Sequence, residues 1–412
     1  MVNLPADFVA ETRRIMGDER FNRFVGAFDE EAPTSIRVNR SRNEKGGRRN
    51  EISSASEQVP WCTEGYYLHD RPQFTFDPLL HAGCYYVQEA SSMFVTHILR
   101  STYSNLVPPS SFLVPRVALD LCAAPGGKST ALRSVLPEDC VLVSNEPMGN
   151  RAQILLENIT KWGAPNCIVT NNYPRDFKKA KLKFDVILCD VPCSGEGMFR
   201  KDPNAINEWS MQNVEKCWQL QREIVADAWE CLNPGGLLIY STCTYNTKEN
   251  EENIQWILEN FDAEVLDIPI EPSWNITGSL LEGFTAPVYR FIPGITRGEG
   301  LFACALHKAG TPTQHAFNTK KLPLKVLETD MPQGDFPQTE VDYQEALKYL
   351  RGEALVLPPD TPKGIVTITY KGQPLGPAKN IGNRANNLYP KAWRIKSTHL
   401  PSEAPRIMNC EL

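Results

Sequence analysis

The stretch VALDLCAAPGGKST, residues 117–130, decides the fold of this 412-residue chain. Residues 117–120 are an apolar run that ends in an acid, as expected for a buried strand of a parallel sheet. Small residues, a proline and two glycines follow, and the glycines allow backbone amides to approach a ligand closely. We therefore predict a strand, a glycine turn and a helix start, which is where α/β sheets bind nucleotide-like ligands.

The glycine turn matches neither of two common phosphate-binding patterns. A Walker A loop requires a glycine where this chain has Cys122, and the dinucleotide fingerprint does not allow the adjacent pair Gly126 and Gly127. Glu146 follows the next apolar run, at the spacing of an acid that hydrogen-bonds a ribose diol. An adenosine ligand without a polyphosphate fits better than ATP. A variant ATP loop and a plain strand–helix connection are the competing interpretations.

Strand and helix patterns alternate downstream of this turn. We predict strands at 117–121, 141–144, 167–170, 185–189 and 237–241, and helices at 128–136, 150–162, 214–232 and 248–260. This alternation is typical of an α/β fold, in which a parallel sheet has helices on both faces. Two further apolar runs, 263–266 and 301–306, are expected to complete the sheet, and the segment between them to cross its surface.

The bulk composition is that of a globular protein, with 42% hydrophobic and 22% charged residues. No apolar run reaches the roughly 20 residues of a membrane span, so no membrane partner is expected. Twelve cysteines without C-x-x-C spacing indicate reduced thiols, a cytoplasmic location and no bound metal. We also expect a monomer.

The charge is unevenly distributed along the chain. The net charge is −6, but residues 361–412 contain eight basic and two acidic residues. This tail carries +6 and the rest −12, which favours a separate basic module. We predict an α+β N-terminal module (1–110), an α/β catalytic domain (111–310), and a linker with a basic C-terminal module (311–412). The N-terminal module is expected to contain helices in 5–28, a strand at 35–39, a polar loop at 41–57 and short strands in 61–76. The C-terminal module is expected to contain a helix at 341–350, a strand at 365–370 and a turn-rich segment at 376–396.

Two polar stretches carry the candidate chemistry. DVPCSGEGMFRK (190–201) and STCTYN (241–246) each follow a predicted strand, so Cys193 and Cys243 emerge at the sheet edge that bears the glycine turn. A lone free cysteine is usually a small core residue. Two cysteines in polar loops beside one crevice instead indicate chemistry.

A thiolate beside an adenosine site suggests methylation of a pyrimidine if the ligand is S-adenosylmethionine. Attack of the thiolate on C6 makes C5 nucleophilic, which is covalent catalysis. Asp190 is placed to stabilise this adduct at N3, and a second thiol can help to remove the C5 proton and release the first. The residues alone leave open whether Cys193 or Cys243 is the nucleophile.

The motifs LDLCAAPGGKST, DVPCSGEGMFRKDP and STCTYNTKENEENI resemble those of the Sun-type (NSUN/RsmB/RsmF) RNA cytosine-5 methyltransferases. EGMFRKDP looks most like the bacterial RsmF/YebU branch, whose members modify small-subunit ribosomal RNA. The resemblance covers roughly residues 35–308. It implies a Rossmann-like class I methyltransferase fold with a mostly parallel seven-stranded sheet, and S-adenosylmethionine as the cofactor.

The resemblance also implies roles for individual residues. Cys243 would be the nucleophile, Cys193 would help to release the product, and Lys128 would orient Asp190 and the base. The adenine contact after the third strand would fall to Asn171, Asn172 or a backbone amide. The residues implied to contact the cofactor are Cys122, Ala123, Ala124, Pro125, Gly126, Gly127, Lys128, Glu146, Asn172 and Asp190.

The segment NNLYPKAWR resembles the RNA-binding C-terminal extension of the same branch. We expect ribosomal RNA as the partner, with transfer RNA as the alternative. A catalytically idle RNA-binding ribosome-assembly factor is the alternative from another class. Arg384, Lys391 and Arg394 are predicted to contact phosphates, and Tyr389 or Trp393 to stack on bases. The target cytosine would have to leave its stack to reach the thiolate.

Overall fold

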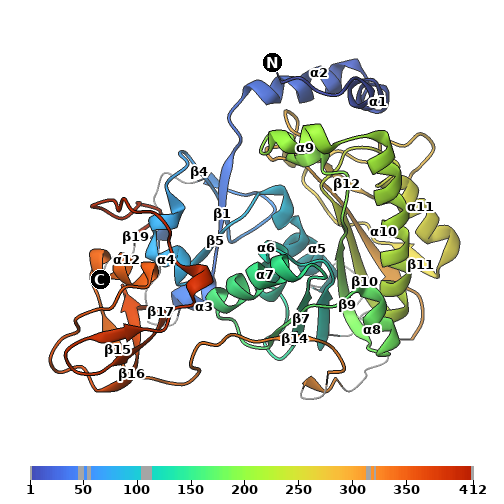
Figure 1. Ribbon diagram of the computed structural model, residues 1–412. Coiled ribbons are helices and arrows are strands. Elements are labelled where there is room, and N and C mark those ends of the chain that lie inside the picture. The colour runs from blue at the N-terminus through green and yellow to red at the C-terminus, as the bar shows by residue number, and fades with distance from the viewer. Residues whose placement is uncertain are drawn as a thin grey trace.

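The computed structural model describes residues 2–44, 51–52, 57–103, 114–311, 317–319 and 322–409. Its centre is a sheet of nine strands with helices on both faces (Figure 1). One smaller sheet precedes the central sheet in the chain, and another follows it. Within the described ranges, no helix is both long enough and apolar enough to span a bilayer.

The central sheet contains the seven predicted strands. Along the sheet the order is β11-β13-β10-β9-β6-β7-β8-β14, with β12 paired to β13. Strands β8, β7, β6, β9 and β10 run parallel, whereas β13 is antiparallel to β10 and β11 to β13. Two short strands, β12 and β14, were not predicted. The strands are β6 (Val117–Asp120), β7 (Val141–Asn145), β8 (Cys167–Thr170), β9 (Phe184–Asp190), β10 (Leu232–Thr242), β11 (Ala263–Val265), β12 (Tyr289–Phe291), β13 (Leu301–Lys308) and β14 (Val326–Leu327).

Alternate side chains of β9 pack into separate cores on the two faces of the sheet. Val186 and Leu188 join a cluster that includes residues of α5 and α6, whereas Ile187 and Cys189 join residues of α8, α10 and α11. A strand buried on both faces is continuously apolar, which explains why the run was recognisable in the sequence. The helices around the sheet are α5 (Phe94–Tyr103), α6 (Gly127–Arg133), α7 (Gly149–Trp162), α8 (Pro174–Lys179), α9 (Pro203–Glu208), α10 (Met211–Cys231) and α11 (Glu251–Asn260).

Helix α11 begins three residues later than the predicted start at residue 248. Asn250 has φ −107° and ψ −101°, outside the helical region. Its side chain accepts a hydrogen bond from Thr242 Oγ1 at 2.6 Å and donates to the carbonyl of Thr244 at 3.0 Å. These bonds tie the residue before the helix to the loop that carries Cys243.

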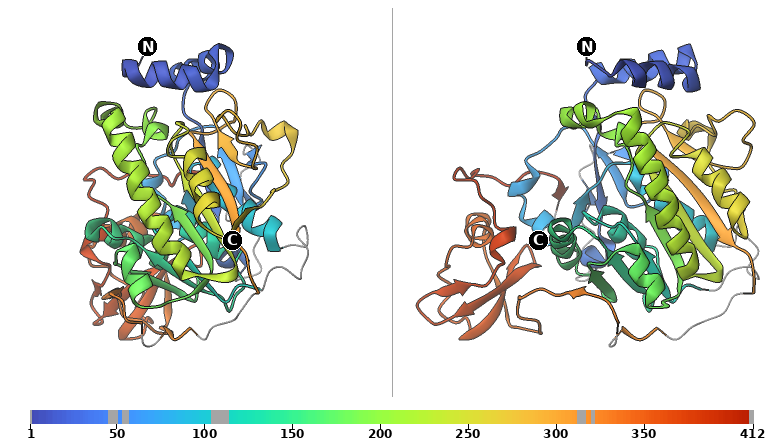
Figure 2. Two further views of the ribbon diagram at one scale, coloured as in Figure 1. Left: turned by 90° about the vertical axis from the view of Figure 1, so that its right-hand side faces the viewer. Right: turned by 45° about the vertical axis from the view of Figure 1, so that its right-hand side comes forward.

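The N-terminal region forms a small antiparallel sheet with the order β3-β4-β1-β5. Two helices precede it and lie over the α9 end of the central layer (Figure 2). Phe8 and Phe24 pack there in one cluster with Phe199, Trp209 and Tyr245. The elements are α1 (Ala6–Met16), α2 (Asp18–Gly26), β1 (Thr34–Val38), α3 (Arg40–Glu44), β2 (Glu51–Ile52), β3 (Glu57–Gln58), β4 (Gly65–Leu68), α4 (Pro78–His81) and β5 (Tyr85–Val87).

The predicted loop at 41–57 is wrong where α3 and β2 occupy it. Residue 57 lies in β3, and the remaining residues of that loop, 45–50 and 53–56, lie outside the described residues.

The C-terminal region forms a second small sheet, β15-β16-β17-β18. The expectation of a turn-rich segment at 376–396 is wrong for β17 and β18, and Gly376 and Pro377 lie in β17. Tyr389 is also wrong as a stacking residue: it is 2% exposed, between Tyr349 and Trp393. The elements are β15 (Gln338–Glu340), α12 (Tyr343–Arg351), β16 (Gly364–Tyr370), β17 (Gln373–Asn380), β18 (Ala385–Asn387) and β19 (Met408–Asn409), which pairs with β2.

Candidate active site

The glycine turn connects β6 to α6, and within it Pro125 is exposed and Gly127 is half-buried. Gly126 has φ 114°, a left-handed conformation that favours glycine. A Cβ on Gly127 would lie 3.3 Å from the ring of Tyr86, so a side chain there would crowd the neighbouring module. Ser129, in the first turn of α6, donates a hydrogen bond to Asp120 Oδ2 at 2.7 Å. This hydrogen bond ties the start of α6 to the end of β6, on the two sides of the turn.

A cavity of about 590 Å³ lies beside this turn. Its volume falls within the range of about 300–1,000 Å³ that is usual for small-molecule sites. Gln88, Glu89 and Ser92 of the N-terminal region also border it. Of the residues predicted from the sequence, it is lined by Cys122, Ala123, Ala124, Pro125, Gly127, Lys128, Asp190, Cys193 and Cys243, whereas Gly126, Glu146 and Asn172 lie outside the lining.

The two predicted cysteines meet in this cavity. The Sγ atoms of Cys193 and Cys243 are 3.3 Å apart, although 50 residues separate them in the chain. Cys193 follows β9 and Cys243 follows β10, and these strands are parallel neighbours. The two loops are also joined by a hydrogen bond from the Gly197 amide to the Cys243 carbonyl at 2.7 Å.

The environment of the two thiols is not symmetric. Their mutual hydrogen bond lowers the pKa of Cys243 and raises the pKa of Cys193 well above its usual value. Burial raises the pKa of both. At Cys243 the charge of Asp190 raises the pKa further, and the smaller effect of the Lys128 ammonium group lowers it. Of the two thiols, Cys243 therefore has the lower pKa.

Lys128 and Asp190 form an ion pair beside the thiols. Lys128 Nζ lies 2.9 Å from Asp190 Oδ2, and Ser241 Oγ donates to Asp190 Oδ1 at 2.7 Å. Burial by itself lowers the pKa of Lys128, but the charge and hydrogen bond of Asp190 raise it above its ordinary value. Ser241 was not predicted from the sequence, although its position two residues before Cys243 was a possible signal.

Two buried carboxylates near the turn bear on whether an adenosine-type cofactor fits. Asp120 Oδ1 and Glu146 Oε2 have no hydrogen-bond partner within the described part of the chain. Glu146 Oε2 has one ion-pair contact, at 3.5 Å from Nη1 of the half-exposed Arg151. Glu146 Oε1 accepts a hydrogen bond from the Met148 amide at 3.0 Å. A carboxylate oxygen with spare acceptor capacity suits the hydroxyl groups of a ribose. The open turn, the cavity and these acids fit such a cofactor.

The two asparagines after β8 hold a neighbouring strand. Asn172 donates to the Lys325 carbonyl at 3.1 Å and accepts from the Lys325 amide at 3.0 Å. The amide of Asn171 donates to the carbonyls of Glu146 and Pro147 at 2.8 and 3.0 Å. The Asn172 bonds help to place β14 beside β8, a pairing that gave no recognisable signal in the proline-rich sequence, whereas the Asn171 bonds hold the segment after β7.

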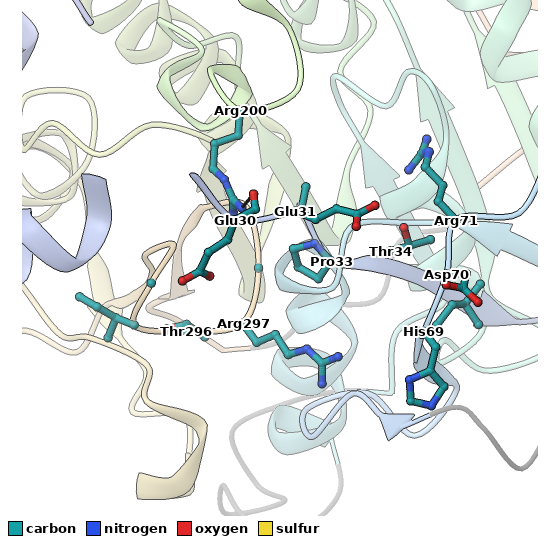
Figure 3. Close-up of a pocket in the computed structure, with 15 residues that line it drawn as sticks. Glu30, Glu31, Pro33, Thr34, His69, Asp70, Arg71, Arg200, Thr296 and Arg297 are labelled. Atoms are coloured by element: carbon teal, nitrogen blue, oxygen red, sulfur yellow. Dashed lines mark hydrogen bonds between the residues drawn. The ribbon is translucent and has the colours of Figure 1, made fainter. Parts of the chain in front are cut away.

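A second cavity, of about 430 Å³, is lined by residues 30–34, 68–71 and 294–298 and by Arg200 (Figure 3). Arg200 reaches one wall, where it donates to Glu299 Oε1 at 2.7 Å and to the Glu30 carbonyl at 3.0 Å. Glu299 borders the cavity that contains the cysteines, so this ion pair lies between the two. Carboxylates and guanidinium groups both line the second cavity, and their charges largely offset each other.

The strand order, the glycine turn and the open cavity at the carboxyl ends of the strands define a Rossmann-like methyltransferase fold. Family descriptions match three parts of the chain: "16S rRNA methyltransferase RsmB/F" at residues 115–307, the N-terminal domain of 16S rRNA methyltransferase RsmF at 4–90, and the methyltransferase RsmF PUA domain at 336–395. The chain belongs to this RsmB/F family.

Curated relatives named ribosomal RNA small subunit methyltransferase F match the chain. The protein of Serratia proteamaculans is 33% identical, over 74% of this chain and 64% of its own length. The Enterobacter protein is 32% identical, over 80% of this chain and 69% of its own length. The match to the Cronobacter sakazakii protein is 29% identical and covers 95% of this chain and 96% of that protein. In the first match, the chain spans less than two thirds of its relative.

Solved structures support the fold. A methyltransferase homologue from Pyrococcus horikoshii is 27% identical, with a TM-score of 0.58 over 74% of this chain and 96% of that one. NSun6 from the same organism, solved with SFG, has a TM-score of 0.58 and 20% identity, and the match covers 74% of this chain and 98% of that one. At that identity the second likeness concerns the fold alone.

Proposed function

We propose that this protein transfers a methyl group from S-adenosylmethionine to C5 of a cytosine in RNA, with small-subunit ribosomal RNA as the substrate. One observation carries the proposal: two thiols 3.3 Å apart share a cavity with the Lys128–Asp190 ion pair, next to the glycine turn. This set contains a nucleophile, a second thiol for release and an acid for the ring.

The glycine turn and Glu146 would hold the cofactor. Cys122–Pro125 and Gly127 line the cavity, and Glu146 offers a carboxylate oxygen without a hydrogen-bond partner for the ribose. When bound, S-adenosylmethionine supplies an electrophilic methyl group. The remaining steps belong to side chains of the protein.

Cys243 acts as the nucleophile in this proposal. Its thiolate forms a bond to C6 of the cytosine, and the electron pair of the C5–C6 double bond moves towards C5 and N3. N3 takes up a proton that Asp190 relays from the ammonium group of Lys128, its ion-pair partner, while Ser241 holds the carboxyl group in place. After C5 has gained its substituent, Cys193, which has given its own proton to solvent, accepts the C5 proton. The C5–C6 double bond then reforms, the Sγ–C6 bond breaks to free the Cys243 thiolate, and N3 returns its proton to Asp190.

RNA is proposed as the partner because the chain matches a PUA domain model and curated relatives named for ribosomal RNA. Arg384 and Lys391 are exposed on the C-terminal sheet and its following turn, where they can reach phosphates. The division into 1–110, 111–310 and 311–412 assigns RNA contacts to the two outer parts. A flipped-out cytosine would enter the cavity that contains Cys193 and Cys243.

The test is bisulfite sequencing of ribosomal and transfer RNA from cells with and without the protein. We expect one or a few cytosines of small-subunit ribosomal RNA to lose protection when the gene is removed. Loss at a transfer RNA position would favour the alternative substrate. No lost position, together with no methyl transfer in vitro, would favour the non-catalytic assembly factor. Binding of ATP in preference to S-adenosylmethionine would favour an ATP-dependent enzyme.

A further inference from the structure

The loops that carry the two cysteines are joined by two buried carboxylates, and one of them, Glu196, lies on the Cys193 loop. Glu196, three residues after Cys193, is 2% exposed. Its Oε2 accepts hydrogen bonds from the backbone amides of Tyr245 at 2.6 Å and Asn246 at 3.0 Å. These two amides begin two residues after Cys243. The carboxylate on one cysteine loop therefore holds the backbone of the other.

The second oxygen of Glu196 is also fully used. Oε1 accepts from Trp209 Nε1 at 3.0 Å and from Asn246 Nδ2 at 2.9 Å. All four donors are N–H groups, and an ionised carboxylate can accept from all of them at once. A neutral amide side chain could accept only through its single oxygen, and its NH₂ group would face donors. This arrangement requires a negative charge at that position.

Other contacts run between the same two loops but do not replace this carboxylate. Ser194 Oγ and Thr244 Oγ1 are 3.0 Å apart. Glu249 accepts from the Ser194 amide at 3.0 Å and from Asn246 Nδ2 at 2.8 Å. Asn246 is thus shared between two carboxylates, whereas the backbone amide of Tyr245 is held by Glu196. The Gly197 amide holds the Cys243 carbonyl directly, and the Glu196 bonds hold the next part of the loop, at Tyr245 and Asn246.

We propose that Glu196 is a positioning residue that sets the close approach of the Cys193 and Cys243 thiols. It does not contact the reacting atoms and acts through the Tyr245–Asn246 backbone. The consequence for RNA methylation depends on the function proposed above. The thiol geometry can be measured without RNA or cofactor.

The first test measures that geometry through disulfide formation. The full-length protein is equilibrated with mixtures of glutathione and glutathione disulfide. One glutathione disulfide oxidises Cys193 and Cys243 to a bond and yields two glutathione molecules, which is followed by mass spectrometry of the linked peptides. We expect Glu196→Gln to lower this equilibrium constant by about tenfold or more, because the thiols are no longer held together. An unchanged constant in a folded Glu196→Gln protein overturns the proposal.

Glu64→Gln is the matched control, because Glu64 is equally buried but pairs with Arg100 and Arg40 in the N-terminal region. We expect its disulfide constant to match the wild type. An equal fall in the disulfide constant of Glu64→Gln would mean that loss of any buried carboxylate destabilises the fold, and it would overturn the proposal. If Glu196→Gln does not fold, Glu196→Asp keeps the charge but withdraws it by one methylene. The same fall in the disulfide constant is then expected, and a constant equal to the wild type overturns the proposal.

The second test measures turnover. A loss of alignment between catalytic groups predicts that Glu196→Gln lowers kcat about 100-fold while the Kd for RNA changes by less than about twofold. It also predicts that the covalent RNA adduct accumulates, since Cys193 no longer reaches the position needed for release. A fall in kcat with an unchanged disulfide constant overturns the positioning role. If the wild-type protein methylates no RNA, only the proposed function fails, because the disulfide measurement still decides the role of Glu196.

Discussion

Lys128 forms an ion pair with Asp190, with Nζ 2.9 Å from Oδ2, and its charge also acts on the thiol of Cys243. One ammonium group from the glycine turn therefore serves two residues that follow different strands. It favours the ionised form of Cys243 and holds the carboxyl group of Asp190 by hydrogen bonding. The residue that ends the glycine turn thus connects the proposed cofactor site to the proposed nucleophile.

Replacement of Lys128 should therefore change the pH dependence of the reaction as well as its rate. The lysine lowers the pKa of Cys243, so Lys128→Met should raise that pKa and move the acidic limb of the pH–rate profile to higher pH. We expect kcat to fall about 100-fold near neutral pH, because a preorganised charge is lost from the site. The check is kcat/KM measured from pH 6 to pH 9. A lower rate with an unchanged midpoint of the acidic limb would contradict the electrostatic role.

Asp120 should make stability depend on pH. Burial raises the pKa of this carboxyl from 3.8 to about 7, so the folded protein keeps a proton that the unfolded chain releases above pH 4. The stabilisation is complete below pH 4 and is lost as the pH rises to 7.

The variant Asp120→Asn cannot lose this stabilisation. Its free energy of unfolding, relative to the wild type, should therefore rise by about 2 kcal/mol between pH 5 and pH 8. Chemical denaturation at both pH values measures the difference. A difference that stays constant with pH would show that Asp120 is ionised throughout.

RNA affinity should depend on exposed cations of the C-terminal region. Replacement of both Arg384 and Lys391 by Gln should weaken binding, and the slope of log K against log salt should fall by about 1.4, or about 0.7 for each lost phosphate contact to single-stranded RNA. Lys179→Gln on α8 is the control, since that lysine is exposed but lies on the central domain. If the double variant kept the wild-type slope, the C-terminal region would not bind the RNA backbone through these residues.

The central sheet could be predicted from the sequence because its strands are buried on both faces. Residues such as Ile187 and Leu188 must both be apolar there, and the resulting runs are recognisable without a structure. The meeting of Cys193 and Cys243 could also be anticipated, since both follow strands of the same parallel sheet. Parallel order alone brought their loops to one edge.

The contacts that hold the site could not be predicted in the same way. Ser241, Glu196 and Glu249 act through hydrogen bonds between loops, and such pairings have no periodicity in the sequence. Strands β17 and β18 were missed because glycine, proline and asparagine usually mark turns. Their pairing with β16 supplies the hydrogen bonds that local preference does not. Tyr389 was misjudged because burial is decided by α12 and Trp393, which pack against it.

The order of events at the two cysteines is the central claim, and trapping of a covalent RNA adduct tests it most directly. Wild-type, Cys193→Ala and Cys243→Ala proteins are each incubated with S-adenosylmethionine and substrate RNA and resolved on denaturing gels. We expect the adduct to accumulate with Cys193→Ala, where release is blocked, and to be absent with Cys243→Ala. An adduct with Cys243→Ala and none with Cys193→Ala would reverse the two roles and contradict the account.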